Sequence, residues 1–241
     1  MSKRVSRSLL DPIFLPMVKP LYSAMPIPRA FPPEGIIAVG HVLAIAGAYG
    51  FAKSPALAWA GWLAVIGVLG NHIADMVDGT HARATGQCRN GGELLDHFTD
   101  PLSFSYWMVG LGVASNRLDL ALLAVISIYA SAVLTNIRAK ITGEFLLHRF
   151  GPTEFKVLLA GCGAALAVAN IVGTDPFEVA QVAKWMLLIL GVALAVQTVV
   201  SLISAVRAVN RDQTPPDSSE WVVDGADTNS ETTSTSTPDA L

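Results

Sequence analysis

Charged residues are scarce in this chain. Only 15% of its 241 residues are Asp, Glu, Lys or Arg, whereas 52% are hydrophobic, and the mean hydropathy is +0.49. A soluble domain needs more polar side chains than this to cover its surface, so the composition is too apolar for an ordinary soluble domain. A membrane protein is the class that this composition favours.

Cysteine is also scarce, with only two residues in the chain. Cys88 lies in a polar stretch and Cys162 within an apolar run, and neither has a partner at metal-ligand spacing. We therefore expect neither a structural disulfide nor a cysteine metal site.

The amino-terminal stretch lacks the continuous apolar core of a signal peptide. Its early bases are followed by five interrupting residues, Asp11, Pro12, Pro16, Lys19 and Pro20. This pattern predicts that residues 1–34 form an interfacial segment that lies on the membrane before the first span.

Long uncharged runs dominate the rest of the sequence. Cutting the chain at its charged residues leaves six runs of 16 to 22 residues: 35–52, 54–74, 101–116, 120–137, 157–174 and 185–206. Each run is long enough as a helix to cross, or nearly cross, a hydrocarbon core of about 30 Å. The polar stripes of a soluble helical bundle are almost missing from them. We predict an all-α polytopic membrane protein whose six transmembrane helices make up a domain over residues 35–208.

The basic residues divide unevenly between the two sides that six spans would create. Thirteen of the sixteen Lys and Arg residues fall on the side of the amino terminus, and only Lys53, Arg117 and Lys184 fall on the other. The positive-inside rule then places both termini and the active site in the cytoplasm. Residues 209–241, which are acidic and rich in Ser and Thr, are predicted to be a disordered tail.

Four aspartates lie at the predicted cytoplasmic ends of the second and third apolar runs. Asp75 and Asp78 are three residues apart and Asp96 and Asp100 are four apart, so each pair shares one helical face. If the two faces turn toward each other, four carboxylates gather in one small volume. Like charges so close resist joint ionisation, and a cation must neutralise them.

The ligand types indicate which cation this is. Oxygen ligands without a nearby cysteine favour a hard ion such as Mg²⁺ or Mn²⁺ over zinc. Gly79 and Gly92 stand beside the aspartates, where a missing side chain lets a ligand approach the backbone. Arg83 offers a forked contact for phosphate oxygens. Together these residues describe a site for a nucleotide diphosphate.

The spacing of these residues is that of a known signature. The pattern Asp75-x2-Asp78-Gly79-x2-Ala82-Arg83-x8-Gly92-x3-Asp96-x3-Asp100 resembles the motif of the CDP-alcohol phosphotransferase family at every fixed position. The resemblance implies a six-helix membrane fold, usually a homodimer, with two divalent metal ions at the cytoplasmic side.

The resemblance also implies a role for each motif residue. Metal ligands would be Asp75, Asp78, Asp96 and Asp100, with Asp100 also accepting the proton of the acceptor hydroxyl. The CDP moiety would contact the motif residues Gly79, Ala82, Arg83 and Gly92 as well as Asp75. Asn71 lies one turn before Asp75 on the same face and is a further candidate for nucleotide contact.

Two segments resemble one branch of the family. Residues 92–97, Gly-Glu-Leu-Leu-Asp-His, look like the form found in eukaryotic choline and ethanolamine phosphotransferases, and His97 is a candidate for assisting proton transfer. Residues 141–154 resemble the corresponding region of aminoalcohol phosphotransferases. In that branch the donor is CDP-choline or CDP-ethanolamine and the acceptor is a lipid hydroxyl such as diacylglycerol.

Two other functions remain open at this point. The chain also departs from the family, because Pro33-Glu34-Gly35 stands where many members have Pro-Asn before the first span. One alternative is a CDP-diacylglycerol-dependent phosphatidyltransferase that acts on a small alcohol or polyol phosphate. The cations that would bind the acceptor's phosphate are then Arg138, Lys140, Arg149 and Lys156. Another is a divalent-cation transporter. Membrane lipids are expected to surround the protein, and no nucleic-acid partner is expected.

Overall fold

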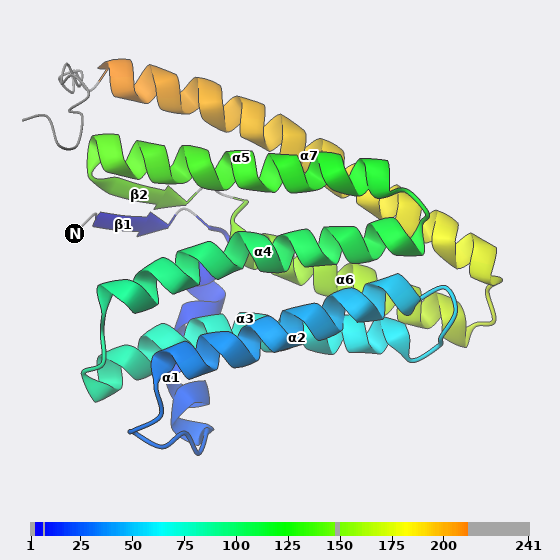
Figure 1. Ribbon diagram of the computed structural model, residues 1–241, viewed down its shortest axis with the longest axis horizontal. Coiled ribbons are helices and arrows are strands. Elements are labelled where there is room, and N and C mark those ends of the chain that lie inside the picture. The colour runs from blue at the N-terminus through cyan, green and yellow to red at the C-terminus, as the bar shows by residue number, and fades with distance from the viewer. Residues whose placement is uncertain (1–2, 7, 148–149, 212–241) are drawn as a thin grey trace, which may run out of the picture.

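Six long helices make up most of the molecule. The computed structural model describes residues 3–6, 8–147 and 150–211. The long helices are α2 (Pro33–Lys53), α3 (Ala60–Thr85), α4 (Asn90–Ala114), α5 (Leu118–Thr142), α6 (Pro152–Ile171) and α7 (Pro176–Arg211). They run alongside one another, and the chain reverses direction between each and the next (Figure 1).

The connections between these helices alternate between the two ends of the bundle. The α3–α4 and α5–α6 connections lie at the same end as the amino-terminal strand and the carboxyl end of α7 (Figure 1). The α2–α3, α4–α5 and α6–α7 connections lie at the opposite end. The segments that hold most of the Lys and Arg residues therefore gather at one end of the bundle. The location of this end in the cytoplasm stays a prediction.

Five of the described helices, α2, α3, α5, α6 and α7, are long and apolar enough to cross a membrane. Such a set of helices fits a multi-pass membrane protein. Helix α4 is not among them, because it is less apolar: Glu93, Asp96 and Asp100 occupy its first half, and its second half includes Ser103, Ser105 and Tyr106. It nevertheless runs the length of the bundle with buried residues such as Trp107 and Leu111 along it (Figure 1). The count of six membrane crossings stays a prediction.

Glycines allow the helices of the amino-terminal half to approach closely. Gly47 of α2 and Gly67 of α3 face each other so tightly that a methyl group on Gly67 would overlap the backbone of Gly47. Gly61 of α3 meets the backbone of Ala167 on α6 in the same way. Small residues at helix contacts are typical of membrane bundles, where close backbone packing replaces the hydrophobic effect as the source of association.

Left-handed glycines end the two helices that precede the charged connections. Helix α3 stops at Gly86, whose φ is 72°, and α5 stops at Gly143, whose φ is 69°. Glycine adopts this conformation without steric cost, so it is the usual residue just past the end of a helix. The stop at Gly86 lets the chain turn and start α4 at Asn90, which brings the second aspartate pair back beside the first.

The amino-terminal segment is attached to the start of α6. Helix α1 (Asp11–Ala24) lies across the bundle and packs against α3 (Figure 1). The Glu154 carboxylate accepts hydrogen bonds from the Ser8 hydroxyl at 2.6 Å and from the backbone N–H groups of Leu9 and Leu10 at 2.7 and 3.0 Å. Hydrogen bonds to a charged group contribute about 1.5–3 kcal/mol each, so Glu154 is a strong anchor. Whether α1 lies on a membrane surface stays a prediction.

Two short strands depart from the all-helical expectation. Strand β1 (Lys3–Ser6) pairs in parallel with β2 (Glu144–Leu147), which belongs to the α5–α6 connection. The sequence gives no signal for this pairing, because the partners are separated by the first five helices. At the other end of the chain α7 continues to Arg211, and the rest of the predicted tail lies outside the described residues.

Candidate active site

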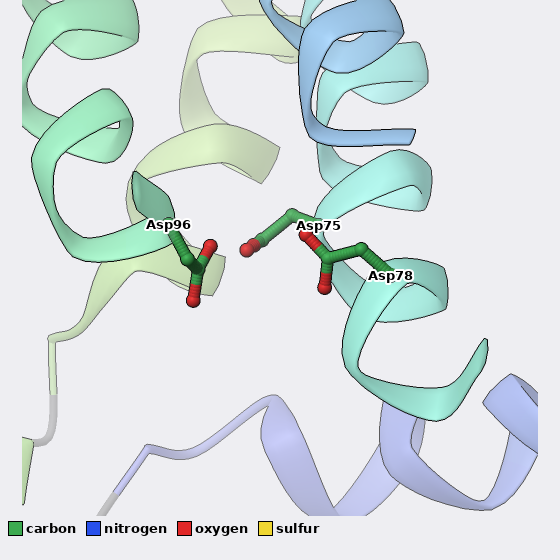
Figure 2. A group of neighbouring side chains, drawn as sticks. All are labelled: Asp75, Asp78 and Asp96. Carbon is green, nitrogen blue, oxygen red and sulfur yellow. The ribbon is translucent and has the colours of Figure 1, made fainter. Parts of the chain in front are cut away.

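The four aspartates of the motif line one small cavity between α2, α3 and α4. Asp75 and Asp78 project from α3 and Asp96 projects toward them from α4 (Figure 2). One carboxylate oxygen from each of these three residues lies within 4.8 Å of the others. The turn at Gly86 and the shared helical faces produce this gathering.

A buried lysine connects Asp100 to this group. Lys156 of α6 places its ammonium 2.7 Å from Asp75 Oδ2 and 3.3 Å from Asp100 Oδ1. The Lys156 side chain is 0% exposed, and its ammonium also lies 5.6 Å from the centre of the Phe104 ring. Asp75 therefore contacts the lysine while sharing the cluster with Asp78 and Asp96.

The cluster fits a divalent metal by its donor set. Its three close ligands offer only carboxylate oxygens, which are the preferred ligands of Mg²⁺ and Mn²⁺. The buried Asn71 Oδ1 nearby accepts no hydrogen bond from the described residues, so the site holds a further oxygen without a protein donor. Asp75, Asp78 and Asp96 are the residues that would hold the ion, with Asp100 beside them.

The Asn71 side chain also joins three helices one turn deeper than Asp75. Its Nδ2 donates to the Gly40 carbonyl of α2 at 3.1 Å and to Ser103 Oγ of α4 at 3.5 Å. Asn71 itself is buried. These contacts hold α2 and α4 against α3 directly below the carboxylates, which is a structural task in addition to the nucleotide contact expected from the sequence.

The glycine and arginine positions of the motif lie on the outer side of the cluster. The Gly79 N–H donates to Asp78 Oδ1, and a side chain on Gly79 would come within 3.2 Å of Arg83 Nη1. Arg83 is exposed and donates to Thr80 Oγ1 at 3.3 Å. A bare backbone at Gly79 therefore leaves room for the Arg83 guanidinium.

Two further motif positions, Ala82 and Gly92, complete this outer rim. The Ala82 carbonyl accepts from the N–H groups of Gly86 and Gln87 and closes the end of α3. Gly92 stands in the first turn of α4, where an added Cβ would lie 3.7 Å from Glu34 Oε1 on α2. The other oxygen of Glu34, Oε2, is buried without a hydrogen-bond partner among the described residues.

His97 lies apart from the three clustered carboxylates. Its ring packs against Phe145 of β2 with the ring centroids 4.9 Å apart, and its Nε2 lies 3.8 Å from Glu93 Oε1. It faces a second, larger cavity that it shares with Asp100.

The larger cavity has a volume of about 180 Å³. Helices α4 to α7 and strand β2 form its walls. Most of its lining is apolar and includes Phe104, Ile128, Phe155 and Leu194. Asp100 lines this cavity as well as the small one, so one carboxylate borders both spaces.

The sequence did not indicate this cavity. Its lining comes from five elements whose packing is set by contacts far apart in the chain. Lys156 did carry a signal, since it is one of the four basic residues that the sequence offers for an acceptor phosphate. Its carboxylate partners became visible only in the structure.

Comparison with known protein families matches residues 36–203 to the family described as CDP-alcohol phosphatidyltransferase. The chain belongs to this family. No curated protein matches the chain. The match covers all six long helices in whole or in part and confirms the resemblance of the aspartate motif at the level of the family. The choline and ethanolamine branch is not confirmed.

Membership fixes the general chemistry of the protein. Members of the family are transferases of phosphate groups that use a CDP-alcohol in phospholipid biosynthesis, and they are typically metal-dependent. The acidic cluster gives this chain a place where a metal would bind. The donor, the acceptor, and the identity and number of metal ions are matters for proposal.

Proposed function

We propose that the protein transfers a phosphoalcohol group from a donor of the CDP-choline or CDP-ethanolamine type to a lipid hydroxyl such as that of diacylglycerol, and releases CMP. The observation that carries this proposal is the position of Asp100. Its carboxylate borders both the aspartate cavity and the larger, mostly apolar cavity. A proton acceptor at this boundary suits a reaction between a diphosphate on one side and a lipid alcohol on the other.

The donor side of the site is the cavity that the four aspartates, Asn71, His41 and Thr99 line. Divalent metal on Asp75, Asp78 and Asp96 would supply charge neutralisation for the diphosphate. Arg83 stands at the outer rim with a guanidinium that suits phosphate oxygens. The bare backbones at Gly79 and Gly92 leave room for the nucleotide.

The acceptor side is supported by the lining of the larger cavity. Aromatic and aliphatic side chains from α4 to α7 surround a volume of about 180 Å³. This space suits the glycerol portion of a lipid better than a charged polyol, because burying a polar group without a partner is costly. Ser131, Thr135 and Gln197 on the same walls can bond the few polar atoms of such an acceptor.

The proposed step is an in-line displacement at the β-phosphorus of the donor. The acceptor oxygen forms a bond to this phosphorus while the bond to the bridging diphosphate oxygen breaks, and the electron pair leaves with CMP. The hydroxyl proton passes to the Asp100 carboxylate. In the donor-free protein the Lys156 ammonium donates to Asp100 Oδ1 at 3.3 Å, and His97 lines the same cavity and is the second candidate for moving this proton.

One observation supports the alternative reaction with CDP-diacylglycerol as donor. Arg138 of α5 lines the larger cavity beside the polar side chain of Asn136. A cation there would suit the phosphate of a small polyol phosphate acceptor. The apolar lining outweighs this feature, so the lipid acceptor remains our first proposal.

The test is a parallel assay of purified protein with CDP-choline, CDP-ethanolamine and CDP-diacylglycerol. CMP release is followed with diacylglycerol as acceptor for the first two donors and with polyol phosphates for the third. We expect Mg²⁺-dependent CMP release with a CDP-aminoalcohol and diacylglycerol. Release with CDP-diacylglycerol alone would select the alternative, whereas Mn²⁺ flux into liposomes without CMP formation would select a cation transporter.

The assembly and orientation belong to the same proposal. We propose a homodimer whose termini and aspartate cluster lie in the cytoplasm. The orientation is supported by the α3–α4 and α5–α6 connections, which lie at the same end of the bundle as β1 and the carboxyl end of α7 (Figure 1) and belong to the side that holds thirteen of the sixteen Lys and Arg residues. Crosslinking of the protein in native membranes would test the dimer, and only monomer would contradict it.

A further inference from the structure

Lys156 lies where a second cation would have to bind. Its ammonium contacts Asp75 Oδ2 at 2.7 Å and Asp100 Oδ1 at 3.3 Å, and its side chain is fully buried. A divalent ion of the Mg²⁺ kind binds carboxylate oxygens at about 2.0–2.1 Å. An ion shared by these same two oxygens would compete with the ammonium for them. The lysine and such an ion exclude each other from this pair.

A second group of carboxylates could hold a divalent ion. Asp75, Asp78 and Asp96 gather oxygens within 4.8 Å of one another, and this group does not depend on Asp100. The four aspartates thus form two overlapping groups. Asp75, Asp78 and Asp96 could bind a divalent ion, whereas Asp75 and Asp100 bind the Lys156 ammonium. Asp75 belongs to both groups.

We propose that Lys156 occupies the second cation position in the donor-free protein, so that one divalent ion binds first and the second binds only together with the CDP-linked donor. The second half of this inference rests on the proposed function. A diphosphate offers the Lys156 ammonium new oxygen acceptors. When the ammonium leaves Asp75 and Asp100, their oxygens become available to the second ion.

The side chain of Lys156 is suited to this exchange. Lysine carries a compact charge on a flexible four-carbon stem, which can move by several ångströms without displacing the helix. The Phe104 ring, 5.6 Å from the ammonium, is a favourable aromatic neighbour for the cation. Phe104 also lines the larger cavity, so this movement stays within the site.

The test counts Mn²⁺ ions per chain in purified protein by calorimetric titration and by electron paramagnetic resonance, which detects two ions that are close together. Donor-free wild type should bind one ion and give the spectrum of isolated Mn²⁺. Lys156→Gln should bind two ions without donor and give a spin-coupled spectrum. Wild type with CDP added should also bind two.

Control variants separate charge from folding. Lys53→Gln removes a lysine at the opposite end of the bundle and should keep the count of one. Lys156→Arg keeps the positive charge and should also bind one ion. If Lys156→Gln does not fold, the wild-type counts with and without CDP still decide the inference.

Two ions in donor-free wild type, or one ion in folded Lys156→Gln, would overturn the inference. A count that stays at one after CDP addition would overturn its second half. The donor-free counts use no substrate, so they are independent of the proposed function. Failure of the proposed function would appear instead as an absence of CMP release in the donor assay.

Discussion

The substitution Asp100→Asn separates proton transfer from metal capture. Asparagine keeps an oxygen at the position that accepts from Lys156 Nζ at 3.3 Å, and it has nearly the same volume. The three-carboxylate group of Asp75, Asp78 and Asp96 does not include the altered residue. The change should therefore leave the fold and the first metal position in place while it removes the carboxylate that accepts the acceptor's proton.

The expected magnitude follows from these contacts. Removing a positioned acid or base lowers turnover by roughly 10²-fold or more, which corresponds to about 2.7 kcal/mol of transition-state stabilisation. Donor affinity should stay within about tenfold of wild type, because the three clustered ligands remain and the amide oxygen of asparagine can still contact a second ion. Asp78→Asn is the matched contrast, since it removes a charge from the cluster itself, and donor binding and turnover should fall together.

The assay combines a donor titration with the rate of CMP release for both variants. Wild-type-like turnover in Asp100→Asn would refute the assignment of Asp100 as the base. His97, which lines the same cavity, would then be the leading candidate. A parallel loss of donor binding in Asp100→Asn would instead mean that Asp100 acts mainly as a metal ligand.

Three further predictions concern the metal, the helix packing and the topology. Excess EDTA should abolish CMP release and Mg²⁺ or Mn²⁺ should restore it, whereas full activity in EDTA would contradict a metal-dependent site. Gly67→Ala should destabilise the protein by about 1–3 kcal/mol through overlap with Gly47, measured as the thermal midpoint in detergent, while Gly161→Ala, which meets no neighbour, should not. Reporter fusions at Leu241 and after Arg117 should report opposite sides of the membrane, and the same side for both would refute six crossings.

The helices and the aspartate pairs were predictable because both depend on local patterns. Each uncharged run of the sequence lies mainly in one long helix, and the spacing of Asp75 and Asp78 fixes their shared face. The run that starts at residue 54 is an instructive exception, since the helix begins only at Ala60. Backbone hydrogen bonds from Ala56 and Leu57 to the Lys53 carbonyl form a turn there instead.

The rest of the site depends on contacts between distant segments. Lys156 reaches Asp75 and Asp100 only because α6 packs against α3, and the larger cavity needs α5 and α7 in place. The pairing of β1 with β2 joins the beginning of the chain to the α5–α6 connection. No periodicity in a single sequence contains such pairings, so they could be obtained only from the structure.

The most direct test of the transfer reaction follows the oxygen atom of the acceptor. Diacylglycerol labelled with ¹⁸O at its free hydroxyl is incubated with the protein, Mg²⁺ and CDP-choline or CDP-ethanolamine, and both products are analysed by mass spectrometry. Attack of the acceptor on the β-phosphorus predicts that the label is retained in the phospholipid and that unlabelled CMP forms in equal amount. CMP formed without labelled phospholipid from either donor would contradict the account.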